Sequence, residues 1–230
     1  MVPTMHLLAM DCAGPACSVA LFRGDEVVAA RHEGMQRGQA ERLVPMIDEV
    51  LKDAATPPAD LDILAVTVGP GAFTGIRIGL ASARAMALAL DIPATGITTF
   101  DATIRNFLSG RPAPPAHPIA VVLETKRRDY YARIFGPDGA ALSDGAALDG
   151  PALCGVLSDI AAEGCILIGD GARRFLENDG AGIAAADLVC GDGYTAVDVG
   201  RCTLGLPPDR SLPPRPLYLR PPDVTVRPAT

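Results

Sequence analysis

Two glycine-rich turns hold the residue types that could bind a phosphate group in this chain. The first follows an apolar run, Asp62–Val68, and contains Gly69, Gly71 and Gly75. Glycines let backbone N–H groups approach an anion, and a helix start carries partial positive charge. The spacing fits neither the G-x-G-x-x-G dinucleotide motif nor the P-loop, which needs Gly-Lys-Ser/Thr. We therefore interpret these glycines first as a tight turn that allows close helix packing, and second as a phosphate site.

Asp11 and the Gly169–Gly171 turn are the other candidates for such a site. Asp11 ends the first apolar strand and could hold a metal-bound water, but a buried carboxylate bonded to backbone N–H groups is the simpler interpretation. Cys12 and Ala13, which follow it, offer weak side-chain hydrogen bonds or none. The second turn is interpreted as a helix entry capped by Asp170. A possible vestigial nucleotide cleft would comprise Asp11, Gly69, Gly71, Gly75, Gly169 and Gly171.

The histidines and cysteines form no recognisable metal or catalytic pattern. The three histidines (His6, His32 and His117) include no H-x-x-x-H pair, so a metallopeptidase lacks its first requirement. There is no G-x-S-x-G elbow and no histidine placed to activate a cysteine. The six cysteines contain no C-x-x-C pair, and we interpret them as buried reduced thiols. We expect no catalytic residue, no metal and no cofactor.

Composition predicts a soluble globular protein. Hydrophobic residues make up 49% of the 230 residues and charged residues 20%, with a net charge of −7. This charge disfavours a broad nucleic-acid-binding surface, although contact of Lys126-Arg127-Arg128 with RNA stays open. No secretory signal pattern is present, and no uninterrupted apolar run approaches the ~20 residues of a membrane span. We expect a cytoplasmic protein.

Alternating strands and helices predict an α/β fold with mixed sheets flanked by helices. Three hairpin-linked strands open the chain, and the first ends in Asp11, as actin-like and sugar-kinase-like domains begin. The Pro-rich segment Ser109–Pro118 is the predicted boundary between an N-terminal lobe (1–108) and a smaller C-terminal lobe with a Pro-rich tail (109–230). The helices expected from periodicity are Gln39–Ala54, Thr74–Leu90, Phe100–Leu108, Pro151–Ile160, one from about Ala172, and Thr195–Leu204.

The helix that ends near Leu90 is apolar on nearly every side. Its strongly polar side chains after Ile76 are Arg77, Ser82 and Arg84, and the two arginines share one narrow face. Such a helix must be covered on all sides, by its own sheet and by neighbouring helices or another chain. We expect this helix and Gln39–Ala54 to form a partner-binding surface. The predicted partner-binding residues are Leu43, Met46, Ile47, Val50, Ile78, Ser82 and Met86.

Three segments resemble the TsaB family: GPGAFTGIRIGLASARAMA at Gly69–Ala87, the preceding helix ERLVPMIDEVL, and YLRPP near the end. TsaB proteins are non-catalytic relatives of the TsaD, or glycoprotease-like, family. The resemblance implies a two-lobed ASKHA (actin-like ATPase) fold with a ribonuclease-H-like sheet in each lobe. In TsaD-like relatives the segment matching Thr99–Thr103 supplies two metal-ligand histidines. Here hydroxyls replace both imidazoles, and hydroxyls are poor ligands for a transition metal.

The resemblance also implies a role as a dimerization or scaffold subunit. TsaB-like proteins pair with TsaD in a heterodimer, recruit the ATPase TsaE, and support transfer of threonylcarbamoyl to N6 of adenosine 37 in tRNA. The same surface would allow a homodimer when the partner is absent, with tRNA bound only through the complex. Three alternatives stay open: an active ASKHA-type small-molecule kinase, a metallopeptidase-like enzyme, and a dimeric binding protein unconnected with tRNA.

Overall fold

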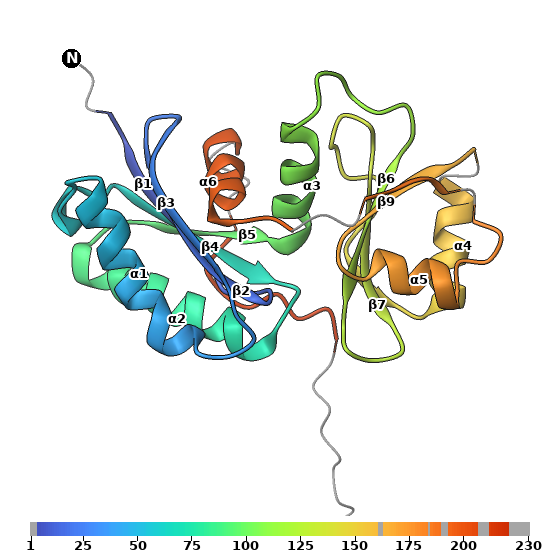
Figure 1. Cartoon of the computed structure of the whole chain (residues 1–230), viewed down its shortest axis with the longest axis horizontal. Coiled ribbons are helices and arrows are strands. Elements are labelled where there is room, and N and C mark those ends of the chain that lie inside the picture. Colours follow the sequence, from blue (N-terminus) through green and yellow to red (C-terminus); the bar gives the residue numbers. More distant parts are fainter. Residues whose placement is uncertain (1–3, 161–162, 184, 190–192, 207–211, 221–230) are drawn as a thin grey trace, which may run out of the picture.

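The computed structural model describes residues 4–160, 163–183, 185–189, 193–206 and 212–220. Two sheets stand side by side with helices on both faces of each, so that helices also lie between the sheets (Figure 1). The elements of the first part are β1 (His6–Asp11), β2 (Ala16–Arg23), β3 (Glu26–Gly34), α1 (Gln39–Asp53), β4 (Ile63–Gly69), α2 (Phe73–Leu90), β5 (Ala94–Thr98) and α3 (Thr99–Ser109). A single 3-10 turn, Pro58–Asp60, precedes β4.

The second part contains β6 (Ile119–Glu124), β7 (Tyr130–Phe135), β8 (Ala146–Leu148), α4 (Gly150–Ile160), β9 (Cys165–Ile168), α5 (Ala172–Asn178), β10 (Ala185–Val189) and α6 (Ala196–Gly205). The first sheet has the order β3-β2-β1-β4-β5, and the second has the order β10-β9-β6-β7-β8. In each sheet the first strand pairs antiparallel with the second and parallel with the fourth. Read from the other edge, the second sheet therefore repeats the first, strand for strand.

Four apolar clusters hold the layers together. Because successive residues of a strand point to opposite faces, Leu8 and Met10 of β1 pack under α1 and α2, while Leu7 and Ala9 face α6. In β6, Ala120 and Val122 likewise face α4 and α5, while the alternate residues pack against α3. The two inner helices, α3 and α6, contact each other. The inner strands β1, β4, β6 and β9 are thus buried on both faces, which explains their continuous apolar runs.

The fold confirms the expected α/β class with two mixed sheets, and it places two segments differently from the simple division at residue 108. Val199 of α6 packs on the first sheet, although α6 follows the second sheet in sequence. Segment 212–220 also returns to the first sheet, where Leu212 pairs with Gly96 beside β5. Residues 109–230 therefore do not form one separate C-terminal unit.

Local predictions also differ in detail. Two strands, β8 and β10, were not predicted from the sequence. Helix α1 runs without a break through Pro45, which lies inside it. Much of the expected proline-dense segment (207–211 and 221–230) lies outside the described residues, as does Cys190.

Candidate functional site

Asp11 lies at the end of β1 as a buried carboxyl group. Its Oδ1 accepts hydrogen bonds from the Ala13 N–H at 3.0 Å, from the Tyr194 hydroxyl at 2.9 Å and from the Thr67 hydroxyl. Burial raises the pKa of Asp11, while the hydrogen bonds from Thr67, Ala13 and Tyr194 act against the shift. The carboxylate is therefore a structural anchor that ties the turn after β1 to β4 and to the segment before α6.

The first glycine turn packs directly on the backbone that follows Asp11. A Cβ atom at Gly71 would lie 2.4 Å from the Ala13 carbonyl oxygen, and one at Gly75 would lie 1.9 Å from that of Cys12. The Ala72 N–H donates to the Ala13 carbonyl at 2.7 Å. Gly69 has φ of 105°, a conformation that favours glycine. These contacts confirm the interpretation of the turn as a tight reversal with close helix packing.

The second glycine turn repeats this arrangement in the second sheet. Gly169 has φ of 101°, and a Cβ atom there would lie 2.4 Å from the Val122 carbonyl oxygen. A Cβ atom at Gly171 would lie 2.8 Å from the carbonyl carbon of Leu123. The prediction that Asp170 caps the following helix is wrong, because its Oδ1 accepts from the Glu124 N–H at 2.9 Å and the N-cap residue makes no side-chain cap bond. Asp170 instead joins β9 to the end of β6.

The Tyr194 hydroxyl interacts electrostatically with an aspartate from each of the two turns, Asp11 and Asp170. Its hydroxyl donates to Asp11, and burial raises its pKa well above the usual value, with the negative charges of Asp11 and Asp170 adding to the shift. The two carboxylates therefore act on the same phenol from different lobes. Sequence patterns did not single out Tyr194, because no motif links a tyrosine before the last helix to an acid in the first strand.

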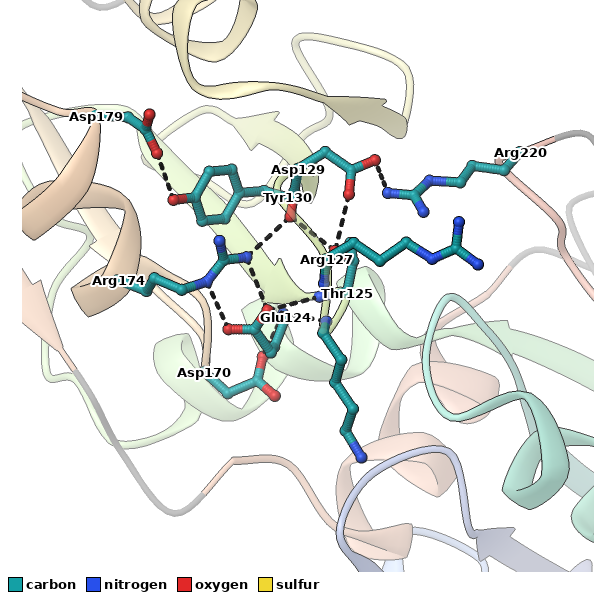
Figure 2. Close-up of polar contacts among 10 residues, drawn as sticks. Glu124, Thr125, Arg127, Asp129, Tyr130, Asp170, Arg174, Asp179 and Arg220 are labelled. Atoms are coloured by element: carbon teal, nitrogen blue, oxygen red, sulfur yellow. Dashed lines mark hydrogen bonds and ion pairs between the residues drawn. The ribbon is translucent and has the colours of Figure 1, made fainter. Parts of the chain in front are cut away.

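A polar cluster surrounds the end of β6 (Figure 2). Arg174 of α5 binds both carboxylate oxygens of Glu124, at 2.8 and 2.7 Å, and also donates to the Asp129 carbonyl. Glu124 accepts two further backbone N–H bonds, from Thr125 and Lys126. Burial opposes the charged form, but these bonds hold the pKa of Glu124 below its usual value. A carboxylate with its oxygens so engaged is poorly suited to act as a general base.

Two further contacts extend this polar cluster to both sides. The Tyr130 hydroxyl donates to Asp179 at 2.6 Å, and the Arg174 guanidinium lies 4.0 Å from the Tyr130 ring centroid. On the other side Asp129 forms an ion pair with Arg220 (Figure 2). The cluster therefore joins the β6–β7 turn to α5 and to the C-terminal segment. Its arrangement is that of a structural clasp.

The structure corrects the expected partner-binding face of α1. Leu43, Met46, Ile47 and Val50 are 0–5% exposed and belong to the core between α1, α2 and the first sheet. They are buried because the strongest apolar stripe of an amphipathic helix packs on its own sheet. A charged residue at Met46 would therefore disrupt folding. In α2, Ile78, Ser82 and Met86 are half-buried at the border of the same core.

The solvent-facing side of α1 and α2 nevertheless carries apolar side chains. Val44 of α1 is 61% exposed, and Phe73 and Leu88 of α2 are 56% and 85% exposed. Ala81, Ala85 and Ala89 of α2 are exposed as well. We call these residues (Val44, Phe73, Ala81, Ala85, Leu88 and Ala89) the outer apolar face. The two helices lie next to each other on the outside of the first lobe (Figure 1).

The C-terminal segment borders this outer apolar face. The Tyr218 ring stacks on Phe73, with centroids 5.9 Å apart, and its hydroxyl accepts from Arg77 Nε at 3.2 Å. One residue earlier, the Leu217 N–H donates to the Val68 carbonyl. The tyrosine of the YLR segment thus has a structural contact on α2 that its sequence pattern alone did not reveal.

Metal binding and membrane insertion each require side chains of a particular kind. Among the described residues, no group of three or more His, Cys, Asp or Glu side chains could hold a metal ion. By length and composition alone, helix α2 could cross a membrane, but it contains Arg77 and Arg84 and one of its faces packs in the first lobe's core.

The family model of TsaD, tRNA N6-adenosine threonylcarbamoyltransferase, matches residues 30–147. The chain is 41% identical over 95 residues to the tRNA threonylcarbamoyladenosine biosynthesis protein TsaB of Escherichia coli, covering 41% of each chain. It is 32% identical over 102 residues to the Bacillus subtilis protein of the same name, covering 44% of each. The matched stretches thus span less than half the length of these two relatives.

Two further matches cover more of the chain. An uncharacterized protein of Mycobacterium bovis is 39% identical over 158 residues, which cover 64% of this chain and 69% of that protein. YeaZ from Pseudomonas aeruginosa has the same fold, with a TM-score of 0.77 at 21% identity over 94% of this chain and all of that chain.

Proposed function

The chain belongs to the TsaB family, and from this membership we propose that it is a non-catalytic subunit in the biosynthesis of threonylcarbamoyladenosine in tRNA. In this proposal it pairs with a TsaD protein, recruits the ATPase TsaE, and supports transfer of the threonylcarbamoyl group to adenosine 37. It acts in the cytoplasm and meets tRNA only through the complex.

The observation that carries this proposal is the outer apolar face. Leu88 is 85% exposed and Val44 is 61% exposed, on two helices whose opposite sides are fully packed. An exposed apolar patch on a folded domain marks an interaction site. Helices with alanines on the exposed side allow close approach of another helix, which suits a helical bundle formed with TsaD. The same face, placed against its own copy, would form a homodimer when TsaD is absent.

The buried polar groups favour a scaffold over an enzyme. Thr99 and Thr103 replace the metal-ligand histidines of TsaD-like relatives, and Thr103 Oγ1 donates to the Thr99 carbonyl at 2.7 Å inside α3. Asp11 and Glu124 lie at equivalent strand ends, and Asp11 Oδ1 and both carboxylate oxygens of Glu124 accept internal hydrogen bonds. We therefore assign the chain's contribution to its surface.

Affinity capture of TsaD from the same organism tests the surface assignment. Leu88→Glu should reduce TsaD capture by at least about tenfold, because a charge buried in an apolar interface costs more than ~1.4 kcal/mol. Leu142→Glu is the matched control, since Leu142 is 50% exposed in the second lobe, away from α1 and α2. Both variants should unfold at the temperature of the unmodified chain. Equal capture by Leu88→Glu and the control would contradict the assignment.

Reconstitution tests the role itself. The chain, TsaD and TsaE are combined with tRNA and the threonylcarbamoyl donor, and modified adenosine is measured with each component left out in turn. Modification should require all three proteins. Calorimetry of the isolated chain with ATP and magnesium covers the kinase alternative, and phosphoryl transfer to a small molecule there would overturn the non-catalytic role.

A further inference from the structure

Two buried thiols face each other across the turn that follows Asp11. Cys12 lies just after β1 and Cys17 lies in β2, one step beyond the last register pair, Asp11 with Ser18. Their sulfur atoms are 3.6 Å apart, with Cys12 donating. Both side chains are 0–1% exposed. Close approach of two thiols across an antiparallel pair provides the two reaction partners of a disulfide.

We propose that Cys12 and Cys17 form a reversible oxidative modification site, in which a peroxide converts the two thiols into an intramolecular disulfide. Facing residues of an antiparallel pair have Cα atoms about 4.5–5.5 Å apart, within the range of about 4.4–6.8 Å that a disulfide needs. The sulfur atoms must move together by only about 1.5 Å to reach a bond of about 2.05 Å. The hairpin already supplies the alignment.

The reaction with hydrogen peroxide balances in two steps. The Cys17 thiolate attacks one peroxide oxygen, the O–O bond breaks, and Cys17 becomes a sulfenic acid while hydroxide leaves. The Cys12 sulfur then attacks the Cys17 sulfur, the S–O bond breaks, and the sulfenic oxygen leaves as water after taking up a proton. In sum, two thiols are oxidised to one disulfide, and one peroxide is reduced to two waters. The hydrogen bond from Cys12 lowers the pKa of Cys17 and so favours Cys17 as the attacking thiolate.

The turn between the two cysteines lies at the surface of the lobe. Gly14 is partly exposed, Pro15 is exposed, and no atom lies within 4 Å of a Cβ position at Gly14. Opening of this turn alone would uncover both sulfur atoms without unfolding the lobe. In the described part of the chain the thiols of Cys154 and Cys202 instead donate to backbone carbonyls, at 3.2 and 3.3 Å.

The disulfide would act on the contact between this turn and α2. The Cys12 carbonyl oxygen lies against Gly75, and the Ala13 carbonyl accepts from the Ala72 N–H. Drawing Cys12 toward Cys17 therefore changes the geometry on which the first turn of α2 rests. We expect the Ala72 amide to exchange with deuterium at a different rate in the oxidised protein.

The test uses the unmodified chain and a single tryptic peptide. Residues 1–23 contain no lysine or arginine before Arg23, so both cysteines and no others lie in one peptide. After mild hydrogen peroxide, denaturation and alkylation, this peptide should carry no alkyl group and lack two hydrogens. Two of the six thiols should be lost, and dithiothreitol should restore them. A fully alkylated peptide, or one carrying sulfinic or sulfonic acid without a linked form, would overturn the proposal.

One serine variant identifies the attacking thiol, and a second serine variant is its control. In Cys12→Ser the Cys17 sulfenic acid has no resolving partner, so dimedone should label Cys17. In the control Cys154→Ser the disulfide should form as in the unmodified chain. Dimedone labelling of Cys17 equal to that of the unmodified chain would contradict the two-step reaction.

Discussion

The two lobes place a carboxylate at the same point of the same topology and treat it in opposite ways. Asp11 ends β1 and Glu124 ends β6, and these strands are equivalent in the two sheets. Burial raises the pKa of Asp11, which is held by hydroxyl and backbone donors. Despite burial, the pKa of Glu124 is lowered by bonds that include the Arg174 guanidinium. In the first lobe the strand-end carboxyl group is held by neutral hydrogen-bond donors, and in the second lobe it is held by an ion pair with Arg174.

The two glycine turns make the same backbone contact in both lobes. Gly71 and Gly171 each bring the turn after the fourth strand against the backbone at the end of the first strand, with atoms 2.4 and 2.8 Å from a Cβ position. Backbone atoms therefore occupy the space that a side chain would need at each of these two glycines. What differs is the side chain that completes the contact, and this difference makes the comparison testable.

The largest effect should come from filling the tightest contact of the first lobe. Gly75→Ala places a Cβ atom 1.9 Å from the Cys12 carbonyl oxygen, so the backbone must shift. We expect a loss of ~3 kcal/mol in the free energy of unfolding, measured in urea. Gly155→Ala in α4 is the control, because no atom lies within 4 Å there and alanine favours helix. Equal stability of the two variants would show that the turn relaxes freely.

Breaking the ion pair of the second lobe should have the next largest effect. Arg174→Ala leaves Glu124, whose side chain is 26% exposed, without its bidentate partner. We expect a loss of about 2 kcal/mol in urea unfolding. Arg174→Lys should fall between the alanine variant and the unmodified chain, because lysine keeps the charge but not the fork. A lysine variant as unstable as alanine would assign the effect to geometry instead of charge.

The two carboxylates should give opposite pH dependences. Glu124 has a lowered pKa, so its stabilisation is present above its unfolded value of 4.5 and is lost as the pH falls through the folded pKa. Asp11 has a raised pKa, so its charge weakens the fold as the pH rises from 3.8 through the folded pKa. At neutral pH Glu124→Gln should lower the melting temperature, whereas Asp11→Asn, which keeps the Oδ1 acceptor, should leave it equal or higher. Melting temperatures measured from about pH 3 to about pH 8, a range that spans the carboxyl pKa values, check the direction of both pH dependences.

The smallest effect should come from the contact between the C-terminal segment and α2. Tyr218→Ala removes the stacking on Phe73, a contact between two half-exposed rings, and should cost about 0.5–1 kcal/mol. Tyr218→Phe keeps the ring and loses only the bond from Arg77, so it should be nearly neutral. A loss above that of Arg174→Ala would show that this segment, more than the ion pair of the second lobe, holds the structure.

The sequence predicted what depends on local pattern. The apolar strands, the long helix and the packing role of Gly71 and Gly75 follow from periodicity and glycine chemistry, and they are confirmed. The sequence did not predict contacts that join distant segments, such as Tyr194 with Asp11 or Arg174 with Glu124, because no spacing rule connects them. The face of α1 was misassigned for a related reason: an apolar stripe does not reveal which surface covers it.

The return of α6 to the first sheet has a consequence for the chain as it leaves the ribosome. Phe22 and Leu7 lie on a sheet face that Val199 of α6 covers, and a Cβ atom at Gly200 would lie 2.1 Å from the Phe22 ring. Synthesis proceeds from the N-terminus, so α6 cannot cover this apolar surface until some 180 further residues have been translated. Helix α6 can cover the first strands only when translation is almost complete. Until then the nascent chain must remain soluble with this apolar sheet face exposed.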